Sequence, residues 1–178
     1  MQRLKSFYKE FIVPKLIDKF NYKSNDAVPK LKKIIINRGF DESCQNNKVL
    51  DSLVSELTQV TGQRLYLTRS KKAISNFKLK EDVPIGMCVT LRREKMYSFF
   101  DRLVNLALPR IRDFQGLKSS GFDGLGNYTF GLLDQSMFPE IEFDKINKFK
   151  GMDIVIVTTA KTDEEALFLL KELGVPFR

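Results

Sequence analysis

Six cationic side chains gather in one short stretch of the chain, between residues 64 and 80, with no acidic residue among them. So many like charges in one segment repel one another unless phosphate groups neutralise them, and this favours a nucleic acid as ligand. Hydroxyl and amide groups at Ser70, Ser75 and Asn76 could add contacts to RNA sugars or bases. A solvated basic surface is the alternative. The six cations are Arg64, Arg69, Lys71, Lys72, Lys78 and Lys80.

The aromatic residue of the same stretch, Phe77, has two interpretations. It could meet an RNA base, or it could be a core residue of a short strand around residues 77 to 79, and we favour the core position. Further along the chain lies a second polar and basic group that a sheet could bring alongside the first. It consists of Thr90, Arg92, Arg93 and Lys95.

Side chains suited to catalysis or to holding a cofactor are scarce. The chain has no histidine, so the commonest general base is missing and neither Cys44 nor Cys88 can join a Cys–His nucleophile pair. Two separate cysteines indicate neither a disulfide framework nor a zinc site, and both are predicted to be reduced core thiols. The glycines of residues 121 to 126 stand in the wrong order for a dinucleotide fingerprint, and no P-loop motif occurs. The sequence therefore predicts no cofactor.

Three carboxylates alternate along one segment, at Glu140, Glu142 and Asp144. This spacing could hold a metal ion or supply an acid–base pair, but it also describes the solvent face of a strand. We favour the solvent face, and we expect neither a metal site nor an enzyme. An enzymatic function would depend on these carboxylates.

The composition is that of a globular protein with an uneven distribution of charge. Of the 178 residues, 43% are hydrophobic and 29% are charged, which predicts a single domain with its own core; the net charge is +8. Residues 1–118 hold 24 basic and 12 acidic side chains, whereas residues 119–178 hold 6 and 10. Phosphate binding should therefore fall mainly on the first two thirds, and the last third is freer to face protein or solvent.

The start of the chain, Met1 to Lys5, lacks the apolar core of a signal peptide. No stretch reaches the ~20 consecutive apolar residues of a membrane span. We expect a reducing, soluble compartment and no contact with a membrane.

Apolar spacing predicts the elements that must position these groups. Helices are expected at residues 4–20, kinked or divided near Pro14, at 48–61, at 94–108 before Pro109, and from the capping box Thr162–Glu165 to Gly174. Strands are expected at residues 31–37, 65–67, 77–79, 84–92, 127–132 and 153–159, with a long glycine-rich loop at 113–127. Helices mixed with antiparallel strands indicate an α+β fold.

Several segments together resemble one protein family across almost the whole chain. The most specific is Pro109-Arg110-Ile111-Arg112-Asp113-Phe114, followed by Phe122-Asp123-Gly124 and Gly126-Asn127-Tyr128. The sequence is similar to the bacterial-type large-subunit ribosomal proteins of universal family five, which bind 5S ribosomal RNA. Further matching segments are Thr61-Gly62-Gln63, Pro84-Ile85-Gly86, Val89-Thr90-Leu91-Arg92, Phe138-Pro139-Glu140-Ile141 and Thr158 to Glu165.

The resemblance implies a single α+β domain without catalysis, whose antiparallel sheet and adjoining loops grip 5S rRNA while other surfaces touch large-subunit rRNA. The expected RNA-binding residues are Asn37, Gln63, Arg64, Thr90, Arg92 and Arg93. A loop expected to reach the elbow of P-site transfer RNA contains Arg69, Ser70, Lys71, Lys72, Ser75, Asn76, Lys78 and Lys80. Residues expected to form an intersubunit bridge with a protein of the small-subunit head are Arg110, Arg112, Asp113, Lys118, Glu140, Glu142 and Asp144.

Two departures from the family pattern stand beside these groups. Glu81 and Asp82 occupy positions where a neutral residue and glycine are usual, and Arg93 stands where glycine often follows. The added acids should weaken the transfer RNA contact.

The expected location is the ribosome, in a bacterial cytoplasm or in the stroma or matrix of an organelle, among neighbouring large-subunit proteins. A composition rich in Lys, Asn, Ile and Phe hints at a plastid. A free-standing RNA chaperone or regulator that uses the same basic surface is the alternative function.

Overall fold

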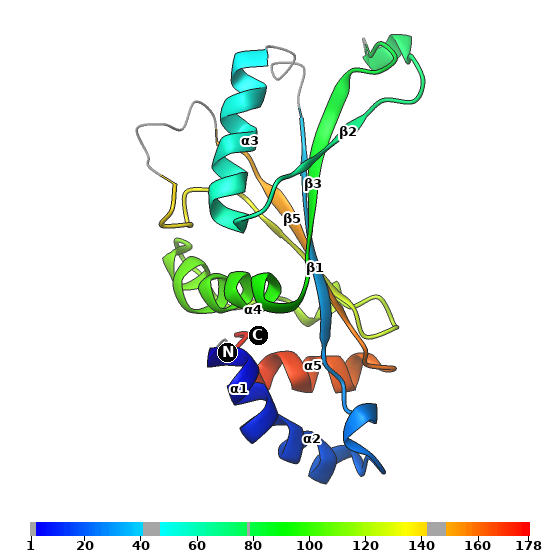
Figure 1. Ribbon diagram of the computed structural model, residues 1–178, viewed down its shortest axis with the longest axis vertical. Coiled ribbons are helices and arrows are strands. Elements are labelled where there is room, and N and C mark those ends of the chain that lie inside the picture. Colours follow the sequence, from blue (N-terminus) through cyan, green and yellow to red (C-terminus); the bar gives the residue numbers. More distant parts are fainter. Residues whose placement is uncertain (1–2, 41–46, 78, 142–148) are drawn as a thin grey trace.

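A five-stranded antiparallel sheet forms the centre of the protein (Figure 1). The computed structural model describes residues 3–40, 47–77, 79–141 and 149–178. The spatial order of the strands is β2-β3-β1-β5-β4, so β1 lies in the middle. The strands are β1 (Leu31–Gly39), β2 (Tyr66–Arg69), β3 (Pro84–Leu91), β4 (Tyr128–Leu132) and β5 (Met152–Thr158).

The helices α3 and α4 lie on one side of the sheet in Figure 1, while α1, α2 and α5 pack together at its lower end. The α-helices are α1 (Arg3–Phe7), α2 (Val13–Phe20), α3 (Asn47–Thr61), α4 (Arg93–Arg102) and α5 (Asp163–Glu172). Wider π-helical turns at Tyr8–Ile12 and Leu103–Ala107 continue α1 and α4, and short 3-10 turns occur at Asn25–Ala27, Ser75–Phe77, Leu108–Arg110 and Ser119–Gly121. A single α+β domain, as the sequence predicted, is confirmed.

Alternate residues of the central strands point to opposite sides of the sheet. Ile34, Ile36 and Arg38 of β1 are buried, whereas Ile35 is half-buried and Asn37 is exposed. Because β3 and β5 follow the same alternation, one face of the sheet forms the floor of the core. We call the other the open face: over β1, β2 and β3 it carries no helix of the described chain.

Local sequence signals explain where the helices begin and end. Pro14 sits in the first turn of α2, but it does not divide the N-terminal helix, because the π-helical turn at Tyr8–Ile12 joins α1 to α2 with helical backbone at every residue. Gly62 follows α3 with φ +64°, and its N–H donates to the Thr58 carbonyl at 2.8 Å. Thr162 caps α5 by accepting from the Glu165 N–H at 3.4 Å, as the capping box predicted.

Two sequence predictions for the segment between β2 and β3 are corrected. The strand expected at residues 77–79 is wrong: residues 75–77 form a 3-10 turn, and Ile74 and Leu79 make only an isolated bridge. Phe77 is 71% exposed rather than a core residue, because this turn lies at the tip of the β2–β3 projection (Figure 1). Lys78 lies outside the described residues.

Cys88 is half-buried on β3, on the open face, and is not a core thiol. Burial nevertheless raises the pKa of this thiol, so it remains largely protonated near neutral pH. Cys44 lies outside the described residues. None of the helices that the structure describes combines the length and apolarity needed to cross a membrane.

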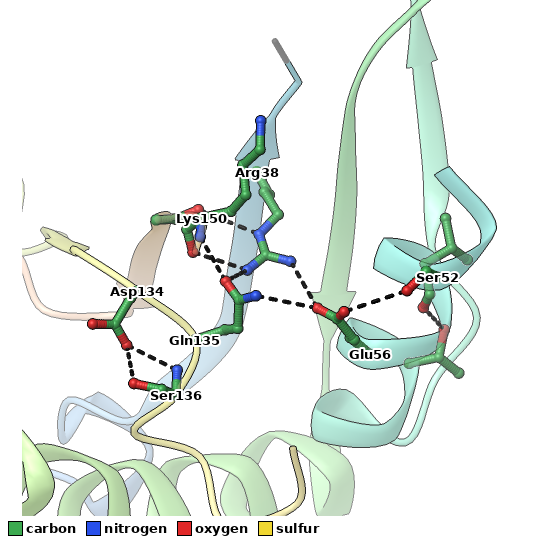
Figure 2. A network of polar contacts seen from close by, with 10 residues as sticks. Arg38, Ser52, Glu56, Asp134, Gln135, Ser136 and Lys150 are labelled. Atoms are coloured by element: carbon green, nitrogen blue, oxygen red, sulfur yellow. Dashed lines mark hydrogen bonds and ion pairs between the residues drawn. The ribbon is translucent and has the colours of Figure 1, made fainter. Parts of the chain in front are cut away.

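A buried polar network joins β1 to α3, to Gln135 and to residues 150–151 (Figure 2). Arg38, 1% exposed, donates to Gln135 Oε1 at 2.5 Å, to the Lys150 carbonyl at 2.9 Å and to the Gly151 carbonyl at 3.3 Å. Its Nη1 lies 3.9 Å from Glu56 Oε2, which also accepts from Gln135 Nε2 at 3.3 Å. The sequence analysis did not identify this network, which fastens three separate segments to one strand.

Candidate nucleic-acid interface

The register of the sheet arranges the residues of the open face in rows, in which polar side chains are mixed with apolar ones. One row runs from β2 to β4 through directly paired residues: Tyr66, Cys88, Asn37, Asp153 and Gly131. The next row contains Thr90, Ile35, Val155 and Thr129. Asn37 and Thr90, two predicted RNA-binding residues, are therefore close neighbours on one surface.

Exposed cations stand at the rim of this face, where β3 ends and α4 begins. Arg92 is the residue that precedes α4, and Arg93 opens the helix with φ +53°. That left-handed conformation favours glycine, which explains why a glycine is usual at this position of the family pattern. A hollow beside these residues has basic walls. Its cationic lining residues are Lys5, Lys32, Arg92, Arg93 and Lys95, with Glu94 as the acidic one.

Lys5 and Lys32 were not among the predicted site residues. They are far from residue 92 in the sequence, and only the packing of α1 and the first residues of β1 against this corner brings them together. The spacing of single lysines in a sequence gives no signal for such a gathering.

Gln63 has an internal role in the structure. Its Nε2 donates to the Thr90 carbonyl at 3.1 Å, and Lys95 Nζ donates to the nearby Gly62 carbonyl at 3.0 Å. These contacts tie the end of α3 to β3 and to the start of α4. Arg64, one residue further, is exposed. RNA contact by Gln63 stays a prediction.

The β2–β3 hairpin projects beyond the rest of the sheet and carries most of the predicted transfer RNA loop (Figure 1). We call residues 69–83 the arm. Most of its predicted contact residues are exposed, but Ser70 is buried, with its Oγ donating to the Lys80 carbonyl at 2.6 Å. The exposed ones are Arg69, Lys71, Lys72, Ser75, Asn76 and Lys80.

Backbone pairing keeps the two sides of the arm together. Ser70 exchanges hydrogen bonds with Val83 and Asp82 at 3.0 and 3.1 Å, and Arg69 Nη1 donates to the Asp82 carbonyl at 2.9 Å. Asp82 has φ +66°, again a conformation that favours glycine. This conformation explains why glycine is usual at position 82 in the family pattern. The tip beyond these bonds exposes Ile74 and Phe77, at 43% and 71%.

The residues predicted for the intersubunit bridge separate into two kinds. Arg110, Arg112, Asp113 and Lys118 are exposed. Glu140 instead points inward and pairs with Arg102, which also donates to the Val60 carbonyl at 3.0 Å. Glu142 and Asp144 lie outside the described residues.

Arg110 and Arg112 line a second hollow, whose other walls are largely apolar. Leu133, 90% exposed, stands at this hollow and was not anticipated from the sequence. Lys118 is not among its lining residues; its carbonyl accepts from the Tyr128 hydroxyl at 2.8 Å. The structure thus groups the two arginines with an apolar patch.

Hydrogen bonds hold the glycine-rich loop between residues 116 and 127. The Asp163 carboxylate accepts from the N–H groups of Gly124 and Gly126 at 3.0 and 2.8 Å. Asp123 accepts from the Asn127 side chain and from two backbone N–H groups, and these bonds lower the pKa of its carboxyl. The loop is therefore fastened to the start of α5. Within the described parts of the chain, no group of three or more metal-binding side chains comes together.

Two family descriptions together match most of the chain. Residues 25–80 match the family described as ribosomal protein L5, and residues 84–177 match the C-terminal part of the same family. The chain is 65% identical to large ribosomal subunit protein uL5c of Euglena gracilis, over 100% of this chain and 99% of the relative. It is 58% identical to large ribosomal subunit protein uL5c of Chlorella vulgaris, over 100% of this chain and 99% of the relative. It is 57% identical to large ribosomal subunit protein uL5 of Trichodesmium erythraeum, over 98% of this chain and 97% of the relative. The chain therefore belongs to the ribosomal protein L5 family, as a structural protein of the large ribosomal subunit, of the bacterial and organellar type, rather than an enzyme.

Proposed function

We propose that the chain binds 5S rRNA with the open face of its sheet and the cationic rim, and thereby joins this RNA to the large-subunit rRNA. The observation that carries the proposal is the side-by-side placement of Asn37 and Thr90 on a sheet face without a helix over it. The rim cations Arg92 and Arg93 are exposed next to them.

The chemistry of this face suits the outside of a folded RNA. An A-form helix offers 2′-hydroxyl groups and base edges in a wide, shallow minor groove, and proteins recognise it chiefly by shape and backbone contacts. The amide of Asn37 and the hydroxyl groups of Thr90 and Thr129 can exchange hydrogen bonds with such a groove, while arginines at the rim pair with phosphates. Much of the face is built from short side chains such as Thr90 and Cys88, so an RNA helix could approach closely.

For the arm we propose contact with P-site transfer RNA. The exposed lysines Lys71 and Lys72 would neutralise phosphates, and the apolar pair Ile74 and Phe77 at the tip could rest against bases or riboses. The internal bonds of Ser70 hold the arm in a projecting conformation without RNA. Glu81 and Asp82 are exposed beside the tip and would reduce the attraction to phosphate.

For the hollow beside Arg110 and Arg112 we propose contact with a protein of the small-subunit head. An apolar patch at Leu133, rimmed by arginines, is suited to a protein surface with an apolar side chain beside a carboxylate. Among a bacterial cytoplasm, a plastid stroma and an organelle matrix, we favour the plastid, supported by the higher identity to uL5c of Euglena gracilis than to the Trichodesmium protein.

The test is a titration of purified protein with 5S rRNA and with an unrelated RNA of equal length, over a series of salt concentrations. Recognition of a folded RNA predicts a preference of at least ~10-fold for 5S rRNA at every salt concentration, or about 1.4 kcal/mol. The double variant Asn37→Ala with Thr90→Ala should remove most of this preference, whereas Lys171→Ala on α5, an exposed charge in the helical layer, should not. Equal binding of both RNAs with the same salt slope would leave only non-specific charge attraction and reject the proposal.

A further inference from the structure

Tyr66 is a large aromatic side chain that the open face leaves uncovered. It is 71% exposed, whereas Tyr8, Tyr97 and Tyr128 are 8%, 7% and 1% exposed. Its register partner is Cys88, whose own partner in the same row is Asn37. The ring therefore lies on the same surface as the residues proposed to bind 5S rRNA.

The neighbours of Tyr66 on this surface are short. Cys88 stands directly opposite, Thr68 follows two residues later on the same side of β2, and Gly86 pairs with Thr68. A Cβ placed on Gly86 would lie only 2.9 Å from the Arg38 carbonyl oxygen, so a larger residue does not fit there without a shift. The residues paired with this part of β2 are thus short, and the phenol ring is left 71% exposed.

Charge around the ring matches a phosphate backbone. Arg64 is exposed two residues before Tyr66, and Arg69 is exposed three residues after it. Because β2 is the edge strand of the sheet, the ring can be approached both from above the face and from the side. An exposed aromatic between cations is the arrangement with which proteins stack unpaired bases while neutralising the backbone.

The other exposed aromatic rings are Phe7, Phe11, Phe77 and Phe149, and they differ in their surroundings. Phe149 directly precedes Lys150, whose backbone bonds to Arg38 and Gln135 in the buried network of the covered face. Phe7 and Phe11 stack on each other with centroids 5.3 Å apart, on the α1 side of the molecule. Phe77 stands at the tip of the arm, away from the Asn37 row. Among the described residues, Tyr66 is thus the largely exposed aromatic on the face proposed for 5S rRNA.

We propose that Tyr66 stacks on an unpaired base that the bound RNA turns out of its helix, so that the open face recognises an interrupted helix rather than a continuous one. A regular duplex keeps its base faces inside the stack, where a tyrosine cannot reach them, and only a bulged, looped or terminal base offers one. This inference rests on the proposed binding of 5S rRNA to the open face. It adds the residue that would select for an extruded base.

The first test compares four variants with the wild type in the 5S rRNA titration. Tyr66→Thr and Tyr66→Ala should each weaken binding by about 10-fold, while Tyr66→Phe, which keeps the ring, should bind as the wild type does. Threonine is the sharper variant because it keeps a strand-forming residue on β2, and unchanged thermal unfolding will show that the sheet is intact. Phe11→Ala, which removes a 55% exposed ring on the other side of the molecule, is the matched control and should have no effect on binding.

A second test detects the stacking itself. The chain has no tryptophan, so Tyr66→Trp provides a single fluorescent indole on the open face, and Phe11→Trp provides a control indole elsewhere. A short RNA duplex with one bulged base should quench the indole at position 66 much more than the same duplex without the bulge. The indole at position 11 should show no difference between the two.

These experiments distinguish a failure of the stacking role of Tyr66 from a failure of 5S rRNA binding itself. Equal binding of wild type and Tyr66→Thr to 5S rRNA, with the preference over unrelated RNA retained, would overturn the stacking role and leave the proposed function standing. Equal quenching by bulged and continuous duplexes would also overturn it. If the wild type shows no preference for 5S rRNA, the proposed function fails, and the inference fails with it.

Discussion

Neighbouring polar residues of β1 are buried on one face of the sheet and exposed on the other. Arg38 is 1% exposed, and its guanidinium makes all of its described contacts inside the protein, whereas Asn37 is exposed on the other side. Both are polar residues in the same extended segment, and only the alternation of side chains along a strand separates them. The covered face uses polar groups to hold segments together, and the open face leaves them available to a ligand.

The cost of a polar group explains why the two faces differ. A charge removed from water loses several kcal/mol of hydration unless partners replace the water, so a buried arginine requires a set of well-placed acceptors. Gln135, the Lys150 and Gly151 carbonyls and Glu56 supply this set. On the open face water hydrates the side chains, and RNA can take the place of that water.

The largest expected effect is on the covered face. Arg38→Ala should lower the free energy of unfolding by about 3–5 kcal/mol, because it leaves the Lys150 and Gly151 carbonyls without this donor and the buried Glu56 carboxylate without its cationic partner. Urea denaturation of the purified protein measures this change. Asn37→Ala, the adjacent residue on the open face, is the matched control and should stay within about 0.5 kcal/mol of the wild type. Similar losses for both variants would contradict the division between the faces.

The converse effect is expected for RNA binding at the rim of the open face. Arg92→Ala should weaken binding of 5S rRNA by about 10-fold and lower the slope of log affinity against log salt by about 0.7–0.9, since one phosphate contact is lost. Stability should change by less than about 0.5 kcal/mol, because the side chain is exposed. Arg92→Lys keeps the charge and should retain the slope. An unchanged slope in Arg92→Ala would place the RNA elsewhere.

The outcome for these residues shows what the sequence could and could not predict. The apolar stripe of α3, the short run of β-branched residues in β1 and the capping box at Thr162 are local patterns, and all three elements formed as predicted. Arg38 looked like the end of a strand, because its partners Gln135 and Lys150 lie 97 and 112 residues away. A local sequence pattern cannot indicate a contact between residues so far apart in the sequence.

The candidate site was predictable to a similar extent. Contiguous cations marked the arm, but the exposure of Phe77 depends on the absence of a second layer at its tip, which only the tertiary structure reveals. Tyr66 was read as part of a strand, and apolar residues on either side of it hid which face it occupies. The internal bond of Gln63 to the Thr90 carbonyl could not be inferred either, since it joins the end of a helix to a strand.

A smaller effect on stability is expected at Arg93, a cation of the rim whose backbone has an unfavourable left-handed conformation. Arg93 has φ +53°, so Arg93→Gly should raise the free energy of unfolding by about 0.5–1 kcal/mol while it weakens RNA binding. Arg93→Ala removes the same charge without relieving the backbone and serves as the control: it should weaken binding equally and gain no stability. Urea denaturation and the 5S rRNA titration give the two readings. A loss of stability in Arg93→Gly would show that its side chain stabilises the fold.

The smallest effect concerns the carboxylate of the covered face. Burial raises the pKa of Glu56 above its ordinary value of 4.5, although Arg38 and a hydrogen bond from Ser52 lower it in part. The folded protein then holds this proton over a range of pH in which the unfolded chain has lost it. The free energy of unfolding of the wild type, relative to Glu56→Gln, should therefore fall as pH rises from below 4.5 through the folded pKa, and then level off. Urea denaturation of both proteins between about pH 4 and 8 measures the difference between their free energies of unfolding. The contributions of the other carboxylates are common to both proteins and largely cancel in this difference. A relative stability that rises with pH would mean that attraction to Arg38 outweighs burial, and that the covered face is held by a fully charged ion pair.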